Sequence, residues 1–285
     1  MSIVVTGATG KLGLLVVEGL LRKVPADEVA AVVRDAAKAA PLAARGVELR
    51  IADYDTPDTF SEAFNDGDVV LLVSSPDAGR RVPQHRAVID AAKEAGVARL
   101  VYTGVLGGPE ANFALAEDHK GTEQAILDSG LPWTFLRNGW YSENYTEQIP
   151  TQLEHGVVGS AGDGKIGSAA REDYAEAAVA VLTEPGHENR SYELSGDQAW
   201  TLPEYAEELS RQSGTEVSYT DVPPDTLKGI LTGAGVPEAF ADILVDVDTS
   251  AIAQGLLEGG SGDLARLIGR PTTPIARSIS AALER

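Results

Sequence analysis

Three glycines near the start of the chain have the spacing of a phosphate-binding turn. They lie in Thr6-Gly7-Ala8-Thr9-Gly10-Lys11-Leu12-Gly13, which follows a short apolar run and opens a segment with helical spacing. Gly7 permits a tight turn, Gly10 lets backbone N–H groups approach a pyrophosphate, and Gly13 lets helix and strand pack closely. The spacing therefore predicts dinucleotide binding, and the alternative is a glycine-rich turn without a ligand. The predicted cofactor-binding residues here are Gly7, Ala8, Thr9, Gly10, Lys11, Leu12 and Gly13.

Arg34 occupies the position that distinguishes NAD from NADP. An NAD site usually has an acidic residue about twenty positions beyond the glycines, at the end of the second strand. This chain has Arg34 there, followed by Asp35. A guanidinium can clamp a 2′-phosphate and offers nothing special to a free 2′-hydroxyl. We therefore expect NADP(H) as the cofactor, although pairing with Asp35 would weaken Arg34, and an exposed surface arginine is the alternative.

Further polar residues close the later strands, where open α/β sheets bind their ligands. Asp53 ends the third strand and is suited to accept a hydrogen bond from an adenine amino group; a solvated loop acid or an N-cap is equally consistent with it. Ser74 and Ser75 close the fourth strand, and Thr103 closes the fifth. We expect these hydroxyl residues to lie beside the dinucleotide.

A familiar catalytic pair is missing from the sequence. Short-chain dehydrogenases that reduce ketones use Tyr-x-x-x-Lys, with the tyrosine as acid and base. None of the 8 tyrosines has a lysine four positions further on. That chemistry, in its usual form, is not expected here.

Alternating strand-like and helix-like segments predict how these residues are positioned. Continuous apolar strands separated by helices are typical of a parallel sheet covered on both faces, with right-handed crossovers. We expect an α/β fold: a Rossmann-like, doubly wound parallel sheet over 1–150, which binds NADP, and a smaller α+β substrate lobe over 151–285. The expected strands are 2–6, 28–34, 47–52, 68–74, 99–103, 132–137, 191–194 and 216–220. The expected helices are 11–23, 36–44, 57–64 with Thr56 as a cap, 81–95 stopped by Gly96, 171–183, 202–213 and 256–268.

Composition narrows the class of protein. The 285 residues include no cysteine, which excludes disulfides, thiolate nucleophiles and cysteine-ligated metals. The 4 histidines have no helical metal-ligand spacing, so no metal is expected. A net charge of −20 repels nucleic acid and anionic membranes. No apolar run is long enough to span a membrane and no signal peptide is recognised, so a cytoplasmic location is expected.

Several stretches resemble the NmrA-like atypical short-chain dehydrogenase/reductases. Within that group the chain is similar to bacterial type-2 NAD(P)H:quinone oxidoreductases and to triphenylmethane reductases. The resemblance spans nearly the whole chain, and the segment from Arg137 to Asn144 is its most specific part. The stretches are TGATGKLG, VVRD, ADYD, PQHR, LRNGWYSENY, LEHGVVGSAGDGKIGSAAREDYA, GHENRSYEL and LIGRPTTP.

The resemblance implies further site residues. Asn138, Gly139, Glu143 and Arg171 are then expected to contact the cofactor. Trp140 and Tyr141 offer flat faces for an aromatic acceptor, although core packing is the alternative for both. His119 lies on a helix expected to border the nicotinamide and is a third candidate for positioning the acceptor; pairing with Glu123 on one helix face is the alternative. Lys120 departs from the family pattern.

The resemblance also implies a reaction. Hydride addition to a quinone gives a hydroquinone anion that solvent can protonate, so the site needs no dedicated acid. We expect an NADPH-dependent reductase that transfers hydride to a quinone or similar conjugated acceptor without flavin. The alternative is an NADP-binding redox sensor that regulates a protein partner without turnover. The sequence does not determine the oligomeric state, and a homodimer is the one assembly that we consider.

Overall fold

The computed structural model describes residues 1–77 and 79–284, and contacts divide the chain into two units. Unit 1 consists of Met1–Gly108, Asp118–Arg137 and Tyr174–Tyr192. Unit 2 consists of Pro109–Glu117, Asn138–Asp173 and the chain from Glu193 onward. Each unit is built from three segments that alternate along the chain, so the two units do not divide at one position near residue 150. The cofactor and substrate roles assigned to 1–150 and 151–285 stay predictions.

A seven-stranded sheet runs in the order β3-β2-β1-β4-β5-β6-β9. The pairings from β3 to β5 are all parallel. The order reverses between β1 and β4, the topology of a doubly wound sheet. This confirms the predicted Rossmann-like α/β fold. The strands are β1 (Ile3–Val5), β2 (Val29–Val33), β3 (Glu48–Ile51), β4 (Val69–Leu72), β5 (Arg99–Val105), β6 (Trp133–Asn138) and β9 (Arg190–Leu194).

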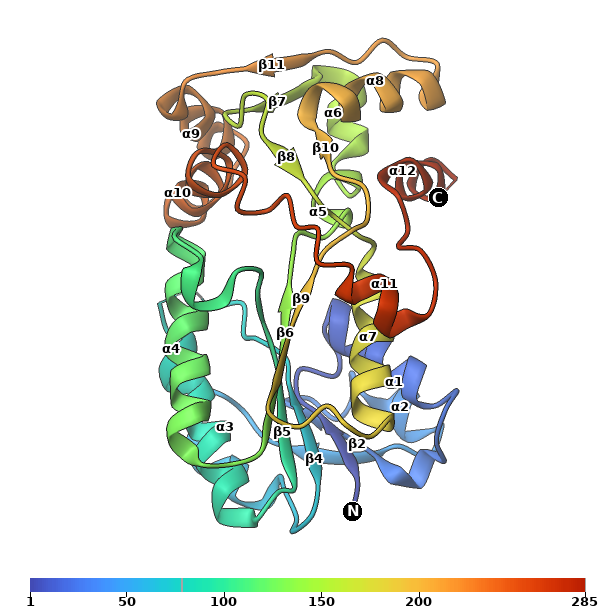
Figure 1. Cartoon of the computed structure of the whole chain (residues 1–285), viewed down its shortest axis with the longest axis vertical. Coiled ribbons are helices and arrows are strands. Elements are labelled where there is room, and N and C mark those ends of the chain that lie inside the picture. The colour runs from blue at the N-terminus through green and yellow to red at the C-terminus, as the bar shows by residue number, and fades with distance from the viewer. Residues whose placement is uncertain (78, 285) are drawn as a thin grey trace. The chain divides into compact units, whose positions relative to one another are not determined.

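Helices cover the sheet because its central strands are apolar on both faces. Every residue of β2 and β5 is buried. Figure 1 shows α1 beside α7, and α3 beside α4. Both contacts depend on glycine: a Cβ on Gly19 would lie 2.7 Å from Val179 of α7, and one on Gly121 of α4 would lie 2.9 Å from Val82 of α3. The elements are α1 (Lys11–Leu20), η1 (Ala26–Glu28), α2 (Ala40–Ala43), η2 (Pro57–Glu62), α3 (Arg81–Ala95), η3 (Gly108–Glu110), α4 (Ala114–Ser129) and α7 (Arg171–Thr183).

Unit 2 is built mainly from short helices with two small strand pairs. Strand β7 pairs with β11 in parallel, and β8 pairs with β10 in antiparallel orientation. The elements are α5 (Glu143–Thr146), α6 (Ile149–His155), β7 (Val157–Gly159), β8 (Lys165–Ile166), β10 (Trp200–Thr201), α8 (Leu202–Ser213), β11 (Tyr219–Asp221), α9 (Pro224–Gly233), α10 (Glu238–Asp246), η4 (Val247–Ile252, a π-helix), α11 (Asp263–Ile268) and α12 (Ile275–Leu283).

Several predicted elements were wrong in extent. The helix expected over 57–64 is the 3-10 helix η2, and Thr56 does not cap it with its side chain. The helix over 36–44 shortens to α2. The helix over 256–268 survives only as α11, because Gly259, Gly260 and Gly262 adopt positive φ angles and interrupt it. The strand over 216–220 moves to β11, and the helices α6, α9, α10 and α12 were missed.

Candidate functional site

The glycine turn joins β1 to α1 as its spacing predicts. Gly7 has a φ of +58°, a conformation that glycine adopts without strain, and its carbonyl accepts the Gly10 N–H at 2.8 Å. A Cβ on Gly13 would lie 2.3 Å from the Gly7 carbonyl oxygen, so the helix and the turn approach too closely for any side chain there. No side chain caps α1, and its first turn holds no acidic residue. The positive end of the helix dipole is therefore suited to an anion.

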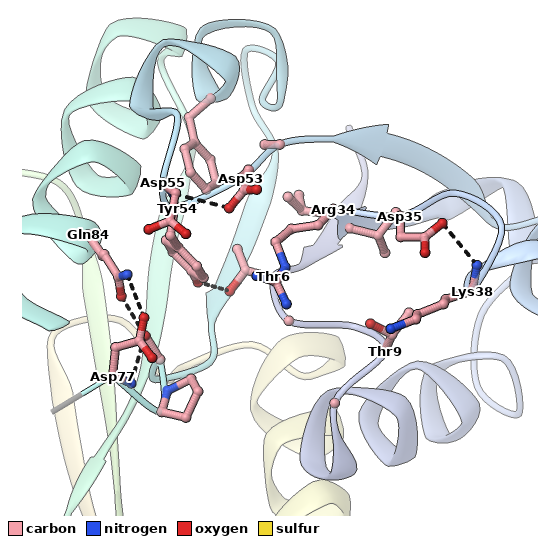
Figure 2. Close-up of a pocket in the computed structure, with 18 residues that line it drawn as sticks. Thr6, Thr9, Arg34, Asp35, Lys38, Asp53, Tyr54, Asp55, Asp77 and Gln84 are labelled. Carbon is pink, nitrogen blue, oxygen red and sulfur yellow. Dashed lines mark hydrogen bonds between the residues drawn. The ribbon is translucent and has the colours of Figure 1, made fainter. Parts of the chain in front are cut away.

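A cavity of about 400 Å³ lies over this turn, at the carboxyl ends of β1 to β4. Its walls bring together many of the predicted cofactor residues with several that the sequence did not single out (Figure 2). The predicted lining residues are Gly7, Thr9, Gly10, Arg34, Asp53 and Ser75. The lining residues not predicted include Thr6, Lys38, Tyr54, Asp55, Pro76, Asp77 and Gln84.

Two cations face this cavity. Figure 2 shows Arg34 pointing in from the end of β2, with Lys38 entering from the same side. The Asp35 carboxylate accepts the backbone N–H groups of Ala37 at 2.8 Å and Lys38 at 3.4 Å. Among the described residues, no carboxylate forms an ion pair with Arg34. The Asp35 carboxylate binds its own turn through Oδ1, and the pairing with Arg34 that would weaken a phosphate contact is not formed among the described residues.

The other three carboxylates of the cavity also have donors within the protein. Asp53 accepts the backbone N–H of Asp55 at 3.1 Å, and Asp77 accepts Gln84 Nε2 at 2.9 Å. Asp55 forms an ion pair with Arg80. Asp53 thus stabilises its own loop and also lines the cavity. This position is consistent with the predicted adenine contact and with the alternative of a loop acid. The Arg34 and Lys38 side chains can therefore bind a phosphate in this cavity.

The remaining predicted residues of unit 1 are not among those that line the cavity. Thr103 Oγ1 accepts the Ser74 N–H at 2.9 Å and thereby holds the end of β4. Ala8 and Leu12 are buried in the core, and Lys11 is exposed at the first position of α1. These three can contribute main-chain groups to a ligand, and their role as cofactor contacts stays a prediction.

His119 is buried in a cluster of aromatic and hydroxyl side chains. It is 6% exposed, and its Nδ1 lies 2.8 Å from Tyr102 Oη. Burial, and then the charge of Arg81, lower the pKa of His119 well below its ordinary value. The imidazole is therefore neutral and packs in the core, and its predicted role in positioning an acceptor stays a prediction. The alternative pairing with Glu123 does not occur, because Glu123 binds Arg137 at 2.8 Å.

A second cluster of predicted residues forms within unit 2. Asn138 Nδ2 donates to Tyr141 Oη at 3.1 Å, and the Arg171 guanidinium lies 5.2 Å from the centre of the Tyr141 ring. Glu143 accepts the Arg171 backbone N–H with both oxygens, at 2.9 and 3.0 Å. We call Asn138, Tyr141, Glu143 and Arg171 the Tyr141 cluster. Gly139 and Trp140 lie beside it in the chain.

The electrostatics of the Tyr141 cluster keep its phenol neutral. Burial raises the pKa of Tyr141, while the hydrogen bond from Asn138 and the charge of Arg171 act in the opposite direction. Asn138 Oδ1 is a buried acceptor with no hydrogen-bond partner among the described residues. Buried acceptors of this kind normally have a partner, which can be an ordered water.

Within residues 1–77 and 79–284, no three histidine, aspartate or glutamate side chains gather as a metal site. No helix in those ranges has both the length and the apolar character needed to cross a bilayer.

The glycine turn, the cavity at the strand ends and its two cations define a dinucleotide-binding protein of the Rossmann type. Residues 7–185 match a family described as NAD(P)H-binding, and the chain belongs to this family. The predicted cofactor class is thereby confirmed.

Relatives cover nearly the whole chain. Quinone oxidoreductase 2 of Escherichia coli (strain K12) is 48% identical over 279 residues, which cover 98% of this chain and 97% of that protein. The crystal structure of the NADPH-dependent quinone oxidoreductase of E. coli complexed with NADPH has a TM-score of 0.96 and 46% identity, and 99% of each chain is covered. Citrobacter sp. triphenylmethane reductase complexed with NADP(H) has a TM-score of 0.94 and 42% identity over 99% of this chain and 100% of that one. The resemblance expected from the sequence is confirmed.

Proposed function

We propose that this protein is an NADPH-dependent reductase that transfers hydride to a quinone or similar conjugated acceptor without flavin. The observation that carries the proposal is the cavity over the glycine turn. Arg34 and Lys38 face this cavity, and its carboxylates are bonded to donors within the protein. The whole-length similarity to a quinone oxidoreductase supports the acceptor class.

The residues of the cavity fit NADPH by shape and charge. The turn from Gly7 to Gly10 and the N-terminus of α1 would hold the pyrophosphate, because only a bare backbone leaves room for it. Arg34 and Lys38 would bind the 2′-phosphate, and Asp53 would meet the adenine. Bound NADPH supplies the hydride for the acceptor.

The Tyr141 cluster is the proposed acceptor-binding surface. Arg171 covers one face of the Tyr141 ring, so stacking of an acceptor is restricted to the other face or to the ring edge. Arg171, which also pairs with Glu147 at 3.3 Å, would place a positive charge beside an acceptor bound there, where negative charge develops on reduction. No proton from the protein is required, because the hydroquinone anion can be protonated by solvent. Trp140 contributes a flat surface to the same proposal.

Loss of NADPH absorbance with a panel of quinones tests the activity directly. Turnover by protein whose visible spectrum lacks flavin bands is the expected result. NADPH binding without turnover of quinones, dyes or azo compounds would refute the proposal and favour the redox-sensor alternative. The cytoplasmic location, the homodimer and the absence of nucleic-acid binding stay predictions.

Paired variants of Tyr141 test the solvent-proton mechanism. Tyr141→Phe keeps the ring and should lower kcat by less than about threefold, because no essential proton comes from the hydroxyl. Tyr141→Ala removes the ring and should lower kcat/KM by more, chiefly through KM for the quinone. A loss of about a thousandfold in kcat for Tyr141→Phe alone would identify the phenol as the proton donor.

A further inference from the structure

Ser75, in the wall of the cavity, has all its polar groups held by one helix. It is 3% exposed and follows β4. Its N–H donates to His85 Nε2 at 3.0 Å, its hydroxyl donates to Gln84 Oε1 at 2.5 Å, and its carbonyl accepts Arg81 Nε at 2.7 Å. Positions 81, 84 and 85 are three and four residues apart, so these side chains project from one face of α3.

The hydrogen bonds determine the tautomer of His85. Because the Ser75 N–H can only donate, His85 Nε2 must accept, and the ring proton lies on Nδ1. Nδ1 lies 2.9 Å from Thr122 Oγ1, whose own hydroxyl donates to the Asp118 carbonyl at 2.9 Å. His85 is 0% exposed, and burial, followed by the charge of Arg81, lowers its pKa to about 3. The imidazole is therefore neutral and bonded at both nitrogens.

The contacts continue from Ser75 to the next residues of the cavity wall. The Asp77 N–H donates to Ser75 Oγ at 3.2 Å, and Asp77 Oδ2 accepts Gln84 Nε2 at 2.9 Å, as Figure 2 shows for Gln84 and Asp77. Ser75, Pro76, Asp77 and Gln84 all line the cavity. The first turns of α3 thus hold a three-residue loop that a dinucleotide would contact.

We propose that His85 is a positioning residue for NADPH. By accepting the Ser75 N–H, His85 fixes the loop from Ser75 to Asp77 before the cofactor binds. A wall that is ordered in advance does not have to be ordered during binding, and affinity rises accordingly. A purely structural role would instead affect folding stability without a specific effect on the cofactor. The proposal rests on the proposed function for its cofactor and not for its acceptor.

Three variants separate positioning from packing. His85→Phe keeps a ring but leaves the buried Ser75 N–H without an acceptor. His85→Gln offers an amide oxygen in place of Nε2 and an N–H in place of Nδ1. Val88→Ala is the matched control, because Val88 is 0% exposed on the same helix and lies outside the cavity wall. Each folded protein is titrated with NADPH, and its melting temperature and Ser75 amide exchange are measured without ligand.

We expect His85→Phe to weaken NADPH binding about tenfold, the effect of one lost buried hydrogen bond, and to speed Ser75 amide exchange. The value of kcat at saturating NADPH should stay within about threefold, so that the loss appears in KM for NADPH. His85→Gln should restore binding to within about threefold of the parent. Val88→Ala should lower the melting temperature and leave NADPH affinity unchanged.

Two results would overturn the proposal. One is parental NADPH affinity in His85→Phe; the other is fast Ser75 amide exchange in the parent protein. Neither measurement needs an acceptor, so absence of quinone turnover would refute the proposed activity alone. If the parent does not bind NADPH, both proposals fail, whereas amide exchange still reports whether His85 holds the loop.

Discussion

Removing the two cations of the cavity should convert an NADPH-selective site into one that treats NADPH and NADH alike. Arg34 and Lys38 are both exposed at the cavity mouth, so water screens their attraction for a phosphate. We therefore take the lower end of the range for a charged hydrogen bond, about 1.5 kcal/mol for each. Arg34→Ala or Lys38→Ala should then weaken NADPH binding about tenfold. The double variant should lose up to about a hundredfold, and less if both cations share one phosphate oxygen.

NADH provides the internal reference, because it lacks the 2′-phosphate. Its affinity should change by less than about twofold in all three variants. Arg45→Ala is a suitable control: Arg45 is an exposed arginine of unit 1 outside the cavity wall, and its loss changes the net charge equally. Fluorescence titration or calorimetry with both nucleotides gives the four dissociation constants needed for each comparison.

The salt dependence of NADPH binding tests the same prediction in a second way. Raising the ionic strength from about 0.1 to 1 M shortens the screening length from about 10 to 3 Å. The parent's preference for NADPH should fall over that range, whereas the double variant should show almost no salt dependence. Equal weakening of NADPH and NADH by Arg34→Ala, or an equal effect of Arg45→Ala, would refute the assignment of the 2′-phosphate site.

Gly10→Val should keep the fold but lose measurable NADPH binding, because its side chain would occupy the place of the pyrophosphate; affinity within a few-fold of the parent would place the phosphates elsewhere. Gly13→Ala should instead lower the melting temperature and NADPH affinity together, since its Cβ would lie 2.3 Å from the Gly7 carbonyl oxygen. Burial raises the pKa of Asp248 to about 6, so the stability that its protonated form contributes is present below about pH 4 and lost as pH rises through 6. Asp248→Asn, which can still accept the Ser160 N–H, should therefore raise the melting temperature at pH 7 by about 2–4 °C and give no gain at pH 4; a gain independent of pH would contradict this.

Local signals predicted the bounds of several helices. The helix over 81–95 ends at Gly96 as expected, because Gly96 adopts a φ of 74° and returns its N–H to the last turn. The helices over 171–183 and 202–213 also have their predicted bounds. In each case the apolar spacing and the terminating residue lie within one segment of sequence.

Proline explains most of the helices that were missed in unit 2. Pro223, Pro237 and Pro274 immediately precede α9, α10 and α12, and each occupies the N-cap position. No helix was expected in these three segments. A proline at the start of a helix costs no hydrogen bond, however, because the first N–H groups of a helix have no internal partner. Only the packing of the following turns decides between a loop and a helix.

The same distinction limits what could be predicted about the site. The glycine turn and Arg34 could be found because their roles depend on neighbours within a few residues. Whether Arg34 is available to a phosphate depends on where the Asp35 carboxylate binds, and that is a property of the folded turn at Ala37 and Lys38. The loop at Ser75 is a stronger case, since its donors and acceptors come from a helix turn that begins six residues later. The glycine turn and Arg34 are thus readable from sequence, whereas the residues that hold the cavity wall in place become visible only with the fold.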